Sequence, residues 1–303
     1  MTDGEIVFAV LRGHEHDPGP SALALRLMGA VHRLVLTGAA PALARHYPSA
    51  GGRPSEPWPA FLDLLRERCA DVRALVEEPV QTNEPARCAA LLGGFLEVAR
   101  QTGLPLRLLE VGASAGLNLR FDHYRYELGD EHWGAPTSPV IVRAHVSGRP
   151  LLGTELQIAS RAGCDLRPLD PRSEDDRLTL AAYVWPDQLE RHERLKAALA
   201  VAQEIDATVD QAGAARWTED RLADAVPDMA TVVFHSIVMQ YLPATERERF
   251  EAALDSAPGP VAWLRMEPAT DEFTEVRLKR WPGGEDRLLA RAGYHGDPVE
   301  WLA

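Results

Sequence analysis

The sequence is poor in lysine and cysteine and contains no long apolar segment. Its 303 residues include only two lysines, Lys196 and Lys279, so arginine supplies the positive charge. The three cysteines, Cys69, Cys88 and Cys164, form no Cys-x-x-Cys pair, which argues against a redox or zinc motif and predicts free thiols. No stretch approaches the ~20 apolar residues of a transmembrane helix, and we therefore expect no membrane association.

The charge balance and the first residues indicate the kind of partner and the location. Forty-five acidic side chains against 32 lysines and arginines give a net charge of −13, and this field repels nucleic acid. We expect a small molecule or a protein as the substrate, and the oligomeric state stays open. The chain starts Met-Thr-Asp-Gly-Glu, whereas a secretory signal starts with basic residues. We therefore expect a cytoplasmic protein.

Two kinds of hydrophobic pattern divide the chain near residue 103. Residues 1–103 carry apolar side chains at helical spacing, with a break rich in proline and glycine at residues 48–59, and are expected to form a helical cover. From residue 104, short apolar runs alternate with amphipathic segments, which predicts βαβ units and a parallel sheet. The expected fold class is therefore α/β, with a Rossmann-like, parallel-rich sheet over residues 104–303.

The individual strands and helices follow from the same pattern. Apolar runs predict parallel strands at residues 106–111, 156–166, 231–239 and 261–266, and helices are expected between them at residues 186–201 and 245–254. Residues 124–128 and 140–146 predict an inserted antiparallel pair, so an inserted hairpin occupies about residues 124–146. Segments 276–281 and 287–294 flank Pro-Gly-Gly-Glu-Asp and predict an antiparallel C-terminal hairpin.

A turn of small residues follows the first expected strand. Residues 108–119 read Leu-Leu-Glu-Val-Gly-Ala-Ser-Ala-Gly-Leu-Asn-Leu, which predicts a buried strand, a tight turn and the start of a helix. Glycines let the backbone turn sharply and let a ligand approach the free N–H groups there. Glu110, at the end of the strand, is expected to accept hydrogen bonds from an amino or hydroxyl group of that ligand.

Asp165 is a second acid in a position that suits a nucleotide. It lies at the tip of the next expected parallel strand, where Rossmann folds hold a ribose diol. The usual separation from the glycine turn is ~20 residues, and Asp165 lies much farther along, so the interpretation requires the insertion at residues 124–146. The alternative is an exposed loop acid.

These segments resemble the motifs of class I methyltransferases that depend on S-adenosylmethionine. Glu110-x-Gly112-x-Ser114-x-Gly116 matches their Glu/Asp-x-Gly-x-Gly-x-Gly motif except for the serine. Residues 163–168 resemble the second motif, residues 232–242 the fourth strand with its loop, and the final hairpin the sixth and seventh strands. The resemblance implies S-adenosylmethionine as the cofactor. The implied cofactor-binding residues are Glu110, Gly112, Ala113, Ser114, Gly116, Asn118 and Asp165, with Gln81 and Asn83 from the helical cover.

Four segments together resemble a bacterial family known as domain of unknown function 2332 (DUF2332). They are residues 81–84 (Gln-Thr-Asn-Glu), 110–119, 165–170 and 185–188 (Trp-Pro-Asp-Gln). This resemblance covers nearly the whole chain and implies a methyltransferase-like fold without an assigned activity. Gln81, Asn83 and Glu84 either line the cofactor site or only begin a helix.

Three side chains are expected at the mouth of the site, namely His235, Tyr241 and Glu267. Methyl transfer depends on holding the acceptor in line with the sulfonium, and a base is required only where the acceptor loses a proton. His235 is the first choice for that base, because an imidazole with a pKa of ~6.5 accepts a proton near neutrality, and Glu267 is the second. His235 also fits a hydrogen-bonded core histidine.

Two other functions stay open. Gly112-x-Ser114-x-Gly116 also matches the nucleophile turn of α/β-hydrolases, and Ser114, Asp271 and His295 follow their triad order. A charge at Glu110 and the absence of a His-Gly-Gly loop before the strand argue against a hydrolase. The other alternative is a Rossmann-like nucleotide-binding protein that transfers no methyl group.

A metal site is not expected. His14-Glu-His16-Asp17 follows an apolar run and contains a His-x-His pair suited to zinc. Further ligands at later strand ends are not evident, so a solvated turn is the favoured interpretation.

Overall fold

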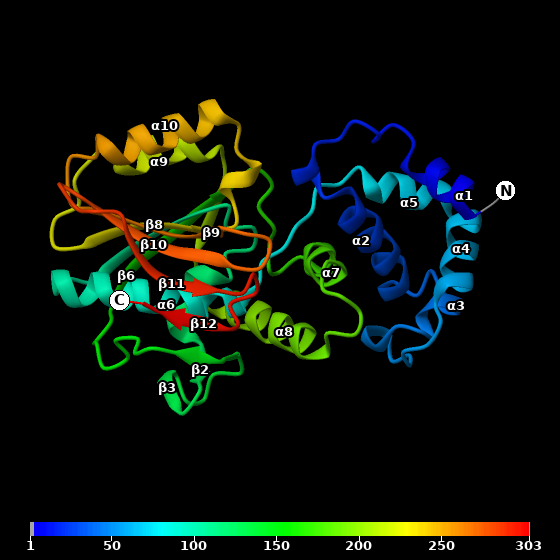
Figure 1. The fold of residues 1–303 in the computed structure, drawn as a ribbon, viewed down its shortest axis with the longest axis horizontal. Coiled ribbons are helices and arrows are strands. Elements are labelled where there is room, and N and C mark those ends of the chain that lie inside the picture. The colour runs from blue at the N-terminus through cyan, green and yellow to red at the C-terminus, as the bar shows by residue number, and fades with distance from the viewer. Residues whose placement is uncertain (1–2, 303) are drawn as a thin grey trace. The chain divides into compact units, whose positions relative to one another are not determined.

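A computed structural model describes residues 3–302, and the chain divides into two compact units (Figure 1). The helical unit runs to Thr82 and includes Asp170–Lys196, and the sheet unit comprises Asn83–Leu169 and the residues from Ala197 onward. This division differs from the expected boundary at residue 103. Helix α6 (Cys88–Thr102) belongs to the sheet unit because it packs on the sheet, and α7 (Glu174–Ala182) belongs to the helical unit because it packs on α2 (Leu23–Leu36).

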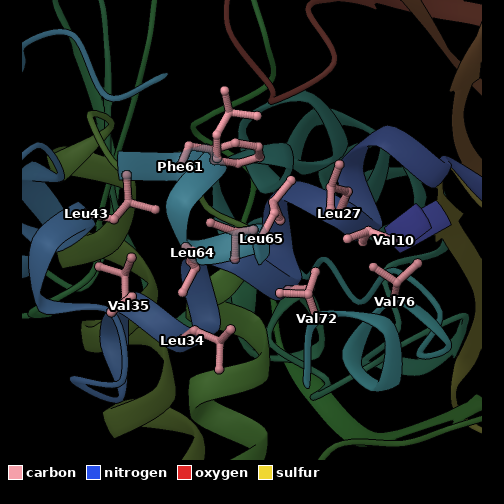
Figure 2. Close-up of a cluster of buried hydrophobic side chains, with 14 of the residues drawn as sticks. Val10, Leu27, Leu34, Val35, Leu43, Phe61, Leu64, Leu65, Val72 and Val76 are labelled. Carbon is pink, nitrogen blue, oxygen red and sulfur yellow. The ribbon is translucent and has the colours of Figure 1, made fainter. Parts of the chain in front are cut away.

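The helical unit has a hydrophobic core of its own, formed by the amphipathic helices near the N-terminus (Figure 2). Its elements are α1 (Asp3–Leu11), η1 (Gly19–Ser21), α2, α3 (Pro41–Ala44), η2 (Pro48–Ala50), α4 (Trp58–Glu67), α5 (Cys69–Val76), α7 and the first part of α8 (Leu189–Glu204). Val31 of α2, Leu65 of α4 and Val72 of α5 are fully buried at 0% exposure, which agrees with their helical spacing.

A buried histidine links three segments of the helical unit. His32 of α2 is 2% exposed, its Nδ1 lies 3.0 Å from the carbonyl oxygen of Ala182, and its Nε2 lies 2.7 Å from Ser49 Oγ. The backbone carbonyl accepts the proton on Nδ1, and Nε2 accepts the hydroxyl proton of Ser49, so the ring is held neutral. Burial lowers the pKa of His32 from 6.5 to about 4.

The sheet unit is built on a nine-stranded sheet in the order β5-β12-β11-β10-β9-β8-β1-β6-β7. Its strands are β1 (Leu106–Val111), β5 (Val146–Ser147), β6 (Ile158–Asp165), β7 (Thr208–Gln211), β8 (Ala230–Ser236), β9 (Val261–Pro268), β10 (Thr274–Trp281), β11 (Arg287–Ala292) and β12 (Val299–Trp301). The run from β7 to β9 is parallel, and β10, β11 and β12 continue it as antiparallel neighbours. The expected α/β class, with a parallel sheet and antiparallel C-terminal strands, is confirmed.

Helices cover both faces of the parallel strands. The remaining elements of this unit are η3 (Pro85–Arg87), α6, η4 (Asn118–His123), the end of α8, α9 (Ala214–Leu222), η5 (Met239–Tyr241) and α10 (Ala244–Asp255). Helices α9 and α10 lie together on one face, where Leu109, Val233 and Trp263 join their core, and α6 packs on the other (Figure 1). Phe95 of α6 contacts Phe234 of β8 edge to face, with ring centroids 5.0 Å apart.

The inserted segment differs from the expected antiparallel pair. Strands β2 (Arg125–Leu128) and β4 (Ile141–Ala144) pair in parallel, and β3 (Glu131–Gly134) is the antiparallel partner of β2. The three strands form a separate sheet in the order β3-β2-β4. The sequence pattern missed β3 because its exposed Glu131-His-Trp-Gly134 carries no apolar alternation, and β7, α7 and α9 were missed as well.

None of the helices within residues 3–302 combines the length and the apolar character that crossing a membrane requires.

We predict that His32 makes the stability of the protein fall in mild acid. Its pKa of about 4 in the folded state lies below the ~6.5 of an unfolded histidine. The contribution is therefore fully present above pH 6.5 and is lost as the pH falls from about 6.5 towards 4, by about 3 kcal/mol in total. Unfolding in urea should be followed by circular dichroism between pH 7.5 and 4.5.

The variant His32→Gln should be less stable at pH 7.5 and should show a shallower loss of stability on acidification than the wild type. His132→Gln, a change at an exposed position of β3, is the matched control and should follow the wild type. A His32→Gln variant whose stability declines as steeply as that of the wild type would contradict this role of the buried ring.

Candidate functional site

The turn after β1 contains three residues in the left-handed region of backbone conformation. Gly112, Ser114 and Gly116 have φ angles of 68°, 53° and 68°. Glycine adopts this conformation without strain, whereas serine does not. Ser114 therefore holds a backbone conformation that favours glycine. The helix expected after the turn is present only as the short 3₁₀-helix η4, which is kinked at Arg120.

Asp165 holds this turn in place. Its Oδ2 accepts a hydrogen bond of 2.9 Å from the backbone N–H of Ser114, and its Oδ1 accepts one of 2.8 Å from the N–H of Arg167. The acid at the end of β6 thus joins the glycine turn to its own loop. Each carboxylate oxygen has room for a second donor, so these bonds leave acceptor capacity on Asp165.

Glu110 is the most unusual side chain at this end of the sheet. It is 2% exposed, and its Oε2 is buried with no hydrogen-bond partner within residues 3–302. The Asn118 side chain hydrogen-bonds the carboxyl group, and Arg120 and Arg87 stabilise its negative charge at longer range, but burial outweighs them and raises the pKa of Glu110 well above its usual value. A buried acceptor without a donor costs about 1–3 kcal/mol, which indicates a ligand group.

The segment from Asn83 to Cys88 completes the surroundings of Glu110. Asn83 Oδ1 accepts a hydrogen bond of 2.9 Å from the N–H of Leu117, and the Cys88 thiol donates one of 3.1 Å to Asn118 Oδ1. Since the Asn118 oxygen is thereby occupied, its amide group is oriented to donate to Glu110. Arg87 donates to the carbonyl oxygen of Ser236 at 3.3 Å, which links this segment to the end of β8.

The loop after β8 is strained and is held by a carboxylate. Ile237 has φ of 57°, which is costly for a β-branched residue and is commonly found at functional sites. Glu267 Oε1 accepts the N–H of Val238 at 2.9 Å, and Glu267 Oε2 accepts the N–H of Met239 at 3.3 Å. The Glu267 side chain is 17% exposed, so it is partly accessible, whereas Glu110 is buried.

His235 faces the other side of the sheet from Glu110. Glu110 is paired with Phe234 on the α6 face, whereas the ring of His235 lies 6.0 Å from that of Phe250 of α10. Trp263 Nε1 donates to His235 Nε2 at 2.8 Å, so the ring proton is on Nδ1 and is donated to Glu267 Oε1 at 2.6 Å. Both ring nitrogens are engaged and the side chain is fully buried. This geometry matches the core-histidine interpretation.

The structure brings together most of the residues expected at the site. Glu110, Gly112, Ala113, Ser114, Gly116, Asn118, Asp165 and Asn83 surround the turn after β1, and Glu267 lies at the loop after β8. Tyr241 is 52% exposed on η5, and Gln81 belongs to the helical unit. Sequence reasoning missed Arg87, Ile237 and Trp263, for which no sequence motif gives a signal.

No cluster of three or more histidine, cysteine or acidic side chains within residues 3–302 is arranged to hold a metal ion. His14 is fixed in the helical unit rather than free in solvent, because its Nδ1 hydrogen-bonds Asp17 at 2.9 Å and its Nε2 lies 3.3 Å from Glu77.

Comparison with known proteins identifies the family of this chain. Residues 1–301 match the family model described as "Uncharacterized protein conserved in bacteria (DUF2332)". The chain belongs to the DUF2332 family. No match was found among curated proteins or among solved structures. Membership of DUF2332 is thus confirmed, and it carries no statement about activity.

We predict that Gly112 is required by packing as well as by backbone conformation. A Cβ atom at Gly112 would lie 2.5 Å from Val238 Cγ2, whereas a Cβ at Gly129, with a similar φ of 64°, would meet nothing within 4 Å. Gly129→Ala should therefore lose only the ~1–2 kcal/mol of left-handed strain. Gly112→Ala should lose about 1–3 kcal/mol more from overpacking.

Chemical denaturation of the two variants measures this difference. Equal losses of stability in Gly112→Ala and Gly129→Ala would show that the loop after β8 does not constrain the turn after β1.

Proposed function

We propose that this DUF2332 protein binds S-adenosylmethionine at the turn after β1 and catalyses methyl transfer to a small-molecule or protein acceptor. The observation that carries the proposal is the buried, unpartnered Oε2 of Glu110. Glu110 lies near the carboxyl end of β1, the middle one of the five parallel strands, where strand order reverses between β1 and β8. Rossmann-like sheets bind their ligands at this switch point.

The residues at the site fit the donors and charges of this cofactor. S-adenosylmethionine carries an ammonium group and a sulfonium, and a buried carboxyl group that lacks a donor suits a cation. Its ribose diol needs acceptors, and Asp165 retains acceptor capacity after its two backbone hydrogen bonds. Glu110 is therefore assigned to the ammonium group and Asp165 to the diol. The sulfonium supplies an activated methyl group when the cofactor is bound.

The roles of the residues around the acceptor follow from their exposure. Glu267 is partly exposed and accepts a proton where the acceptor must lose one. His235 orients Glu267 through the 2.6 Å hydrogen bond from its Nδ1, and Trp263 fixes the tautomer of His235. We therefore assign the base to Glu267 and a positioning role to His235. Tyr241, which is exposed on η5, is assigned to the mouth of the site as part of this proposal.

Two alternatives remain in competition with methyl transfer. The left-handed conformation of Ser114 in Gly112-x-Ser114-x-Gly116 also suits a hydrolase nucleophile turn, but Asp271 lies in the turn between β9 and β10 and is exposed. A Rossmann-like protein that binds a nucleotide without methyl transfer needs Asp165 to hold the ribose, but it does not need Glu267 as a base.

Binding of S-adenosylmethionine should release a proton from Glu110. Burial keeps the pKa of Glu110 high in the free protein, and a cation at Oε2 favours the carboxylate. Affinity should therefore rise with pH above the usual glutamate pKa of ~4.3, by up to about tenfold per unit until the pKa of Glu110 in the free protein is passed. Isothermal titration calorimetry in two buffers that differ in ionisation enthalpy measures both the affinity and the number of protons released on binding.

The variant Glu110→Gln cannot titrate and should bind more weakly, with an affinity that no longer depends on Glu110 ionisation. Glu97→Gln is the control, because Glu97 is also buried but its oxygens are already paired with arginines. Absence of binding of both S-adenosylmethionine and S-adenosylhomocysteine to the wild type would refute the proposed function. Unchanged affinity in Glu110→Gln would refute only the role of Glu110.

Substitutions at Ser114 distinguish methyl transfer from hydrolysis. Ser114→Gly restores the glycine of the methyltransferase-like motif and suits the φ of 53°, so it should keep binding of S-adenosylmethionine within a few-fold. Ser114→Ala should do the same, because the hydrogen bond from Ser114 to Asp165 is donated by the backbone N–H. If the wild type hydrolyses p-nitrophenyl acetate and Ser114→Ala abolishes that activity, the hydrolase is correct.

A further inference from the structure

A cavity at the antiparallel end of the sheet unit carries several cationic groups. Its volume is about 260 Å³, and it is lined by α6, β11, β12 and the loop after β5. The lining residues are Gly93, Glu97, Arg100, Arg149, Pro150, Leu151, Arg287, Leu289 and Trp301. The lining contains three arginines and one acid, so its net charge is positive.

Two of the three arginines form ion pairs with Glu97, the acid of the cavity. Glu97 is 7% exposed, and it pairs with Arg100 and Arg287, each at 3.1 Å. Gln101 also donates to Glu97. These contacts neutralise the buried carboxylate and fix both guanidinium groups at the cavity.

Arg149 has no acidic partner at the cavity. It is an exposed residue, and its side chain forms no hydrogen bond and no ion pair with any residue in the described range 3–302. It lies beside Pro150 and Leu151 in the loop that follows β5, and lines the same cavity as the Glu97 cluster. A guanidinium presents a rigid set of donors that matches the oxygens of a carboxylate or a phosphate.

Trp301 supplies a second donor without an acceptor. It is 8% exposed, and its Nε1 is buried with no hydrogen-bond partner within the described residues. The ring is seated against α6 because Gly93 has no side chain, since a Cβ there would lie 2.3 Å from the Trp301 ring. Buried indole N–H groups normally find a partner, and this one lacks an acceptor in a residue that lines the cavity together with Leu289 and Leu151.

We propose that this cavity binds a small organic anion, whose carboxylate or phosphate oxygens accept from Arg149 and Trp301 and whose apolar part lies against Leu151, Leu289 and the Trp301 ring. The volume is slightly below the ~300 Å³ at which ligand pockets begin, which restricts the ligand to about the size of one aromatic ring with its anionic group. The site is built from residues other than those assigned to S-adenosylmethionine, so it is independent of the proposed function.

The test uses the indole N–H signals of the whole protein in ¹⁵N-correlated NMR spectra. The chain has seven tryptophans, and Trp301→Phe identifies the signal of Trp301. Benzoate, phenyl phosphate and inorganic phosphate are titrated in turn at constant ionic strength. We expect a saturable shift of the Trp301 signal with benzoate or phenyl phosphate, and the tighter of the two identifies the anionic group.

Two variants place the ligand in the cavity. Arg149→Gln removes the unpaired cation and should weaken binding at least tenfold, and Leu151→Trp at a 38% exposed position should fill the cavity and abolish it. Arg45→Gln, at an exposed arginine of the helical unit, should bind as the wild type does. No saturable shift with any probe, or wild-type affinity in both cavity variants, would overturn the proposal. Equal affinity for inorganic phosphate and phenyl phosphate would overturn the contribution of the apolar wall.

Discussion

The reversal of strand order between β1 and β8 is the constraint on which the candidate site depends. Strands β6 and β7 extend the sheet on one side of β1, and β8 and β9 extend it on the other. The chain therefore leaves β1 and β8 in opposite directions, and no single connection covers the edge between them. Small residues at Gly112 and Gly116 and the strained Ile237 let both loops bend away sharply from that edge.

Carboxylates hold the loops after β1 and β8 by accepting hydrogen bonds from their backbone N–H groups. Asp165 accepts the N–H of Ser114, and Glu267 accepts the N–H groups of Val238 and Met239. Acceptors of this kind satisfy backbone groups that a turn leaves without partners. The two loops also touch, because Val238 fills the space in front of Gly112. Glu110 differs from both acids, since one of its oxygens receives nothing from the loops.

Sequence reasoning recovered the features that local chemistry determines. The apolar runs gave β1, β6, β8 and β9 to within a few residues, and the Glu110-to-Gly116 motif located the turn. It could not recover features that depend on the assembled sheet. His235 and Glu110 both end parallel strands, but only the register and the packing of α10 determine that His235 faces a helix core. A hydrophobic pattern likewise could not predict strand β3, because β3 is polar and mostly exposed.

The proposed assignment of Glu110 to a cationic group rests on the charges around this carboxyl group. Arg120, one of two arginines whose charge acts on Glu110, donates to the carbonyl oxygens of Ala115, Gly116, Ala202 and Ile205. Its charge favours the carboxylate form of Glu110, but burial outweighs it and raises the pKa of Glu110 well above its usual value. A neutral donor would satisfy Oε2 without changing the charge of Glu110. A ligand cation gains an ion pair in a region of low dielectric constant, at the cost of releasing one proton.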